Sequence, residues 1–103
     1  MAQQHVVRGV ATTVVDTSEM VVVTYHATAV FKLDRLHSTV TLDTGGYSTA
    51  TTKTRMNQAC SQFDVPLRVV QRDHSWYIMR FEPKTRNLVE TIDFDAASIT
   101  LKL

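Results

Sequence analysis

Threonine and valine dominate the first half of the chain, and both are β-branched residues that suit the pleated surface of a sheet. Residues 5–15 are expected to form a strand, followed by a turn at 16–19, where Asp and Ser can bond their own nearby backbone. From 20 to 33 hydrophobic side chains recur at every second position, which predicts one long strand. Its hydrophobic face comprises Val21, Val23, Tyr25, Ala27, Ala29, Phe31 and Leu33. Asp34-Arg35 is expected to turn the chain into a further strand at 36–42.

Two glycines, Gly45 and Gly46, interrupt this pattern, and helical periodicity follows from about 51 to 63. Asp64 and Pro66 are expected to end the helix, because the residue before a proline disfavours the helical region. The predicted hydrophobic stripe consists of Thr52, Met56, Ala59, Cys60 and Phe63. Candidate N-caps, which accept a bond from an unpaired backbone N–H, are Ser48, Thr49 and Thr51.

The last third returns to strand patterns. Residues 67–71 and 75–81 flank a hairpin candidate at 72–74, and two short strands are expected at 87–94 and 98–103. The predicted fold class is α+β: a mainly antiparallel sheet with a single helix packed on one face, in the order β-β-β-α-β-β-β-β. A chain of 103 residues corresponds to one domain, so we expect residues 1–103 to form a single small α+β domain.

Charge and cysteine content narrow the possible functions only a little. The formal net charge is +1, but residues 53–86 carry seven basic and three acidic side chains, so any basic surface belongs to the helix and the following hairpin. The single cysteine, Cys60, excludes a disulfide within the chain and favours a reducing compartment. We expect neither a signal peptide nor a membrane span, because no charged segment precedes an apolar stretch and no apolar run is long enough.

The central segment also suggests an origin. The run Gly45-Gly46-Tyr47-Ser48-Thr49-Ala50-Thr51-Thr52-Lys53-Thr54-Arg55-Met56-Asn57-Gln58 resembles the Gly-Gly-aromatic-x-Thr-x-Thr-Thr-Lys-x-Arg-x-Asn-Gln motif of a family of small uncharacterised proteins encoded by tailed bacteriophages. Matches in the same order extend from Tyr25 to Phe81, although relatives commonly have Gly-containing spacers in place of residues 64–67. The resemblance implies a phage origin and a location in the cytoplasm of the infected host cell; it implies no particular function.

The helix and its entry carry the densest polar chemistry. If the hydrophobic stripe packs on the sheet, the side chains of Lys53, Arg55, Asn57 and Gln58 are expected to project outward. The Gly45-Gly46 turn is expected to present backbone N–H groups at the positive end of the helix, which suits an anion. This face has three interpretations: an anion or nucleic-acid contact, a polar face that ties the adjacent loop together, or a contact with a protein partner.

Aromatic residues near basic ones are candidate base-stacking groups. Trp76, Ile78 and Arg80 share one face of the strand at 75–81, and Tyr77, Met79 and Phe81 share the other. One of these faces must be buried, and we expect Phe81 to lie in the core. Tyr47 and Trp76 are the stacking candidates, and Arg68 and Arg72 are further phosphate candidates.

The chain offers little for catalysis. His5, His26, His37 and His74 show none of the close spacings of metal ligands, so no metal site and no cofactor are expected. Cys60 falls on the hydrophobic stripe, and no serine lies in a nucleophile-elbow motif, so an enzyme is not expected.

Two functions from different classes remain. The first is a protein-interaction module that binds a host or phage protein through a sheet edge or the helix face. The alternative is a nucleic-acid-binding accessory protein with a basic helix and hairpin face. The low net charge favours the first, and the basic segment favours the second. A homodimer is also possible, since exposed Val/Thr strands can pair across an edge. The binding candidates are Tyr47, Lys53, Arg55, Asn57, Gln58, Arg68, Arg72 and Trp76.

Overall fold

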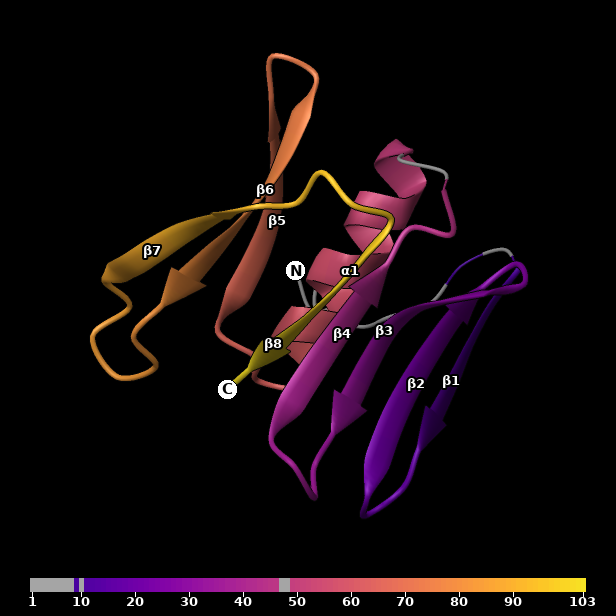
Figure 1. Cartoon of the computed structure of the whole chain (residues 1–103). Helices are drawn as coiled ribbons and strands as arrows, with labels where there is room; N and C mark the ends of the chain where they lie inside the picture. The colour runs from indigo at the N-terminus through magenta and orange to yellow at the C-terminus, as the bar shows by residue number, and fades with distance from the viewer. Residues whose placement is uncertain (1–8, 10, 47–48) are drawn as a thin grey trace.

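Two antiparallel sheets and one helix make up the computed structural model, which describes residues 9, 11–46 and 49–103 (Figure 1). The elements in chain order are β1 (Thr12–Asp16), β2 (Met20–Tyr25), β3 (Thr28–Asp34), β4 (Thr39–Asp43), α1 (Ala50–Gln62), β5 (Leu67–Arg72), β6 (Ser75–Phe81), β7 (Leu88–Asp93) and β8 (Ser98–Lys102). The first sheet has the order β1-β2-β3-β4-β8, and the second has the order β5-β6-β7. The predicted fold class is therefore confirmed, with the strands divided between two sheets.

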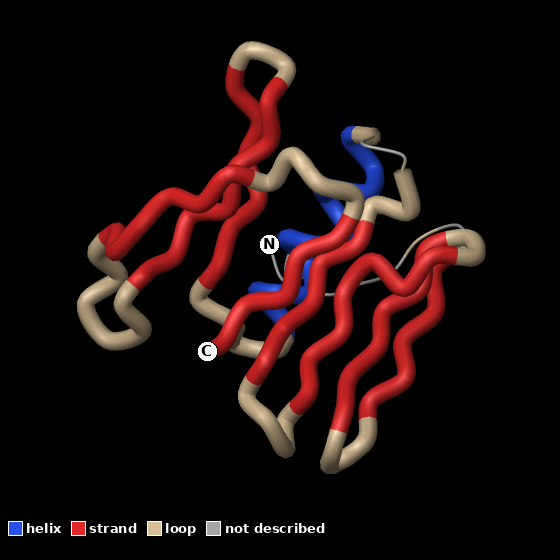
Figure 2. The backbone as a smooth tube through the Cα atoms, in the orientation of Figure 1, coloured by secondary structure: helices blue, strands red, loops and turns tan. Residues whose placement is uncertain are grey.

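The last strand returns to the first sheet and joins the two halves of the chain. β8 pairs with β4, so that Val40 lies opposite Leu101 and Leu42 opposite Ile99. Figure 2 shows the resulting arrangement, in which the two sheets spread apart and the helix lies behind them. α1 contacts β2 and β3 of the first sheet and β5 of the second. The helix therefore closes the angle between the sheets.

One hydrophobic core runs through both sheets and the helix. Its buried members are Val21, Val23, Val30, Phe31, Leu33, Val40, Leu42, Met56, Ala59, Cys60, Val65, Leu67, Val69, Trp76, Ile78 and Phe94. The helix contributes Met56, Ala59 and Cys60, and Thr52 is buried beside them, as the predicted stripe requires. Thr49 is the N-cap: its hydroxyl accepts a hydrogen bond from the backbone N–H of Thr52 at 3.2 Å. The predicted helix and one of its candidate caps are thus confirmed.

The single strand predicted for residues 20–33 is wrong, because β2 and β3 form a hairpin there. His26 turns the chain with a φ of 56°, and its backbone N–H donates to the Ala11 carbonyl at 2.8 Å. No Gly, Pro, Asn or Asp marks this turn, so nothing in the local sequence indicates it. Next to the two-residue loop, Tyr25 pairs with Thr28, so the side chains of β3 start on the face opposite to the predicted one. An irregularity between Val23 and Thr24 then moves the pairing by one residue and restores the predicted face. Phe31 and Leu33 consequently reach the predicted face.

Two smaller expectations also need correction, and a third is only partly covered by the described residues. The strand predicted at 36–42 begins only at Thr39, because Asp34 accepts bonds from the backbone N–H groups of Leu36 and His37 and holds residues 35–38 in a turn. The strand predicted at 5–15 is described from Thr12 onward; residues 5–8 and 10 lie outside the described residues. Phe81 is half-buried, whereas we expected it in the core.

The hairpin predicted at 72–74 is confirmed. Arg72 pairs with Ser75, and the two residues between them, Asp73 and His74, have φ values of 52° and 69°. Positive φ at both central positions is the requirement of a type I′ turn, whose twist matches that of the flanking strands. This hairpin carries β5 and β6, on which the basic residues of the second sheet lie.

Candidate functional site

Asn57 holds the helix against the edge of the second sheet. Its Nδ2 donates to the Val69 carbonyl at 2.9 Å, and the Val69 N–H donates to Asn57 Oδ1 at 2.7 Å. β5 is an edge strand, so the asparagine amide occupies the place that a neighbouring strand would take. The side chain is half-buried, and both of its polar atoms are engaged within the chain.

Arg55 holds the same helix against the first sheet. Its Nε donates to the Thr12 hydroxyl at 3.0 Å, its Nη1 donates to Gln58 Oε1 at 3.3 Å, and its guanidinium carbon lies 5.9 Å from the centre of the Tyr25 ring. The expectation that Arg55, Asn57 and Gln58 all project outward is therefore wrong. Among the interpretations of this face, the geometry favours a structural role, because the three side chains are half-buried and bonded inside the molecule.

The turn before the helix is also satisfied internally. Gly45 and Gly46 have φ values of 64° and 87°, as the double glycine predicts. Their N–H groups donate to Asp43 Oδ1 at 2.7 Å and to Thr44 Oγ1 at 3.1 Å. The expected free N–H groups at this turn are therefore not available to an anion. Tyr47, one of the binding candidates, lies outside the described residues, and Lys53 is half-buried.

The outer face of the second sheet gathers the remaining basic candidates. Pairing places Arg68 opposite Met79 and Arg72 opposite Ser75, and the strand alternation puts Tyr77 between them on the same face. We call this surface the arginine–aromatic face, defined by Arg68, Arg72, Tyr77, Met79 and Phe81. Both arginines are exposed, and the other three side chains are half-buried. Within the described residues, no hydrogen bond or ion pair is formed by either guanidinium group.

Trp76 lies on the opposite, buried face of β6, so its ring cannot stack against a ligand. Its exposed fraction is 6%, and its ring meets that of Phe94 edge-on at 6.1 Å. The sequence alternation separated Trp76 from Tyr77 but could not show which of the two faces is buried. Tyr77 and Phe81, on the accessible face, are aromatic residues that were not among the binding candidates predicted from the sequence.

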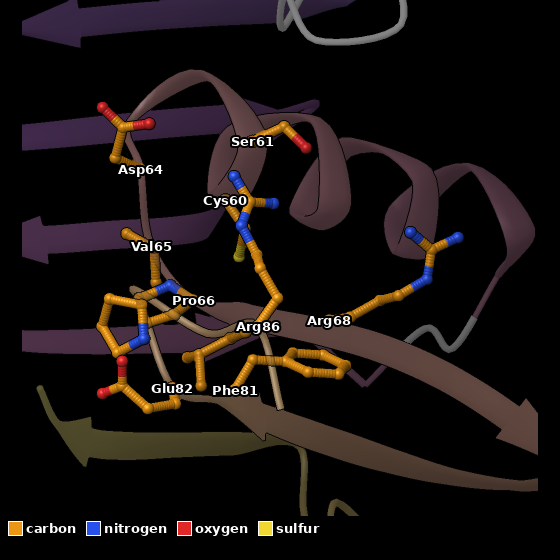
Figure 3. Close-up of a pocket in the computed structure, with 11 residues that line it drawn as sticks. Cys60, Ser61, Asp64, Val65, Pro66, Arg68, Phe81, Glu82 and Arg86 are labelled. Carbon is orange, nitrogen blue, oxygen red and sulfur yellow. The ribbon is translucent and has the colours of Figure 1, made fainter. Parts of the chain in front are cut away.

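A hollow of about 670 Å³ adjoins one end of the arginine–aromatic face. Its walls are formed by Cys60, Ser61, Asp64, Val65, Pro66, Leu67, Arg68, Phe81, Glu82, Pro83 and Arg86. Figure 3 shows Arg86 extending from the β6–β7 loop towards Ser61, with the carboxylates of Asp64 and Glu82 on the other side of the view. The basic side of the hollow is therefore continuous with Arg68 and the arginine–aromatic face.

The thiol of Cys60 in the wall of this hollow is not activated as a nucleophile. Cys60 is 2% exposed, and burial raises the pKa of its thiol to about 12, so the thiol stays protonated at neutral pH. Within the described part of the chain, no three His, Cys, Asp or Glu side chains converge as metal ligands would. The only helix described there, α1, is too short and too polar to cross a membrane.

A second accessible feature is the outer edge of β1. The first sheet ends there, and β1 pairs only with β2 among the described strands. Its residues are exposed on both faces of the sheet, with the exception of the half-buried Thr12. Val14 is 37% exposed and Val15 is 57% exposed, so each face of this edge strand presents an apolar side chain to solvent.

Comparison with known proteins assigns the family. A family model described as Kyanoviridae Gp96 protein matches residues 2–101, which is nearly the whole chain. No curated protein and no solved structure matches. The expected phage origin is thereby confirmed, while the Gly-Gly-aromatic motif stays a prediction. The chain belongs to the Kyanoviridae Gp96 family.

Proposed function

We propose that this chain is a small, non-enzymatic phage accessory protein that binds a host or phage protein in the cytoplasm of the infected cell. The contact is the outer edge of β1, to which the partner adds an extended strand. The single observation that carries this proposal is that no described strand pairs with the outer edge of β1, which has two exposed valines. The helix face is the weaker protein contact, because Arg55 and Asn57 are already engaged inside the molecule.

The backbone of β1 offers hydrogen-bonding groups on its outer side. The His26 N–H bonds the Ala11 carbonyl, and the Thr17 N–H bonds the Met20 carbonyl, so the odd-numbered residues of this segment direct their backbone groups towards β2. Antiparallel strands alternate in this respect, and the N–H and C=O groups of Val14 and Asp16 therefore point away from the sheet. A partner strand bonds to groups of this kind, while its side chains select the site.

The other sheet edges are protected in ways that β1 is not. Asn57 covers β5 at Val69, and Arg80 Nη1 donates to the Lys102 carbonyl on β8 at 2.8 Å. β7 carries Asp93, whose charge opposes the approach of another strand, while its other acidic residue, Glu90, is paired with Arg80 at 3.0 Å. On β1 the only charged residue is Asp16, and its carboxylate is already paired with Arg35 at 2.8 Å.

The test removes one outward donor and leaves the β1–β2 ladder intact. Val14→Pro deletes an N–H group that points away from β2, and proline is tolerated at such edge positions. Val14→Thr is the matched control, because it keeps the N–H group and the β-branched shape. Tagged wild-type protein and both variants are expressed in infected cells, and the retained proteins are quantified by mass spectrometry after circular dichroism has verified the fold.

We expect one protein to be retained by the wild-type chain and by Val14→Thr and to be lost with Val14→Pro. Light scattering of the purified protein identifies the case in which the partner is a second copy, because the dimer would then dissociate in Val14→Pro. A partner that Val14→Pro retains as well as the wild type contradicts the proposal. So does a wild-type chain that stays monomeric and retains no protein.

A further inference from the structure

We propose that the arginine–aromatic face binds single-stranded nucleic acid, with Tyr77 and Phe81 stacking on bases and Arg68 and Arg72 contacting phosphates. The site is on the second sheet and does not involve the β1 edge. The nucleic-acid proposal is therefore independent of the proposed protein contact.

The first argument is the spacing of the four side chains. Arg68 lies opposite Met79, so Tyr77 and Phe81 are its two diagonal neighbours on the adjacent strand; Arg72 lies opposite Ser75 and is diagonal to Tyr77. Diagonal neighbours in a sheet are about 7–8 Å apart, within the reach of long side chains. Each aromatic ring therefore has a guanidinium beside it, which is the arrangement in which a stacked base places its own phosphate near a cation.

The second argument is availability. None of the described strands or helices covers this side of the second sheet, since α1 packs against the first sheet and β5 through its buried stripe. Tyr77, Met79 and Phe81 remain half-exposed even though each has same-face neighbours to shield it. Ring faces in this state suit bases, because every base has a π-face and stacking tolerates any sequence.

The third argument is charge. Arg68 and Arg72 have exposed guanidinium groups that form no ion pair within the described residues, and Arg86 adds a third cation at the adjoining hollow. Asp93 opposes this charge, because it lies across from Tyr77 on the β7 side, and the hollow that contains Arg86 also contains Asp64 and Glu82. The strand of nucleic acid is therefore expected to follow β5 and β6 and to avoid β7.

A single strand fits this face better than a duplex. The rings of Tyr77 and Phe81 are four residues apart on one strand, about 13 Å, which accommodates two unpaired bases. In a duplex the bases stack on one another and do not present their faces to a protein surface. Stacking on these two rings is consequently restricted to unpaired bases.

The test measures fluorescence anisotropy of a labelled single-stranded oligonucleotide and its duplex with the full chain. Two or three phosphate contacts predict that the affinity for the single strand falls roughly 7- to 20-fold between about 50 and 200 mM salt. Arg68→Glu with Arg72→Glu is expected to abolish binding. Lys32→Glu with Lys102→Glu makes the same change in net charge at exposed positions on the outer face of the first sheet, and is expected to have a much smaller effect.

The stacking component has its own variants. Tyr77→Leu keeps hydrophobic bulk and removes the ring, and is expected to weaken binding about 5- to 100-fold. Tyr77→Phe keeps the ring and is expected to bind like the wild type. Asp93→Asn removes the opposing carboxylate and is expected to tighten binding.

Results of three kinds would overturn the inference. The first is no binding of the single strand at low salt by a folded protein. The second is equal loss in the arginine pair and the lysine control pair, which would mean that net charge alone is responsible. The third is an unchanged affinity in Tyr77→Leu, or displacement of the oligonucleotide by polyglutamate at equal charge concentration, because either would show that the bases are not recognised.

Discussion

Asp64 adopts a left-handed backbone conformation that ends the helix. Its φ is 57°, and the following N–H, that of Val65, donates to the Cys60 carbonyl at 2.9 Å. This six-to-one bond, with Cys60 and Val65 both buried, is the geometry of a Schellman motif. Glycine is the usual residue at this position because a Cβ atom disfavours positive φ. Asp64 therefore holds a conformation that costs the chain stability.

Asp64→Gly is expected to stabilise the fold by about 0.5–1 kcal/mol, since the relief of this strain exceeds the added freedom of the unfolded chain. Urea denaturation measures the change. Asp64→Ala serves as the control, because it keeps the Cβ and should give no stabilisation. A lower unfolding free energy for Asp64→Gly than for the wild type would contradict this account of the helix end.

Asp34 organises the turn between β3 and β4. Its carboxylate accepts bonds from the backbone of Leu36 and His37 and from His37 Nδ1 at 2.8 Å. The side-chain bond with His37 is the largest cause that lowers the pKa of Asp34 below its usual value of 3.8. A carboxyl group whose pKa is lowered by folding stabilises the folded state above its unfolded pKa. That stabilisation is lost as the pH falls through the folded pKa.

We therefore expect acidification below about pH 4 to loosen this turn. NMR titration of the Asp34 carboxyl carbon should give a pKa below 3.8 in the wild type and a higher one in His37→Ala. The same Asp34 pKa in both proteins would show that His37 is not the cause.

At the scale of the element, α1 depends on polar contacts as much as on its hydrophobic stripe. Four core positions face the sheets, while Arg55 reaches the first sheet and Asn57 reaches the second. The helix has no acidic residue in its first turn and no basic residue in its last, so charge–dipole interactions add little to its stability. Its position is set by burial together with these two side chains.

Asn57→Ala is expected to lower the unfolding free energy by about 2–3 kcal/mol, because it leaves the Val69 N–H and C=O without partners at a part-buried edge. Guanidinium denaturation provides the measurement. Lys53→Ala, one helical turn earlier on the same border, is the matched control and should change the stability by less than about 0.5 kcal/mol. Equal effects of the two substitutions would contradict the role given to Asn57.

At the scale of the whole molecule, Arg80 links the two sheets. Its side chain extends from the buried face of β6 and donates from Nη1 to the Lys102 carbonyl on β8 at 2.8 Å. Its Nε lies 3.0 Å from Glu90 Oε2 as an ion pair rather than a hydrogen bond. Arg80 therefore joins β6 to β8, which lie in different sheets, as Arg55 and Asn57 join the helix to the two sheets.

Arg80→Met is expected to lower the unfolding free energy by about 1–2 kcal/mol and to speed amide exchange in β8, since the Lys102 carbonyl loses its donor. Hydrogen-exchange mass spectrometry resolves β8 from the other strands. In Glu90→Gln the change should be small, because Glu90 is 52% exposed and surface ion pairs contribute little. Unchanged exchange in β8 of Arg80→Met would rule out this link.

The sequence by itself determined the features that depend on neighbouring residues. The β-branched alternation, the helical stripe through Thr52 and Met56, and the turn chemistry at Asp73-His74 are local, and they predicted the fold class, the helix and the β5–β6 hairpin. Only the tertiary structure decided what depends on partners far along the chain. The turn at His26 has no local signal in the sequence. The alternation placed Trp76 and Tyr77 on opposite faces of β6, but only the packing of the core decided that the face of Trp76 is the buried one. Likewise, the sequence predicted that Arg55 and Asn57 belong to a binding surface. In the structure they bond to Thr12 of β1 and Val69 of β5, and so hold the helix against the two sheets.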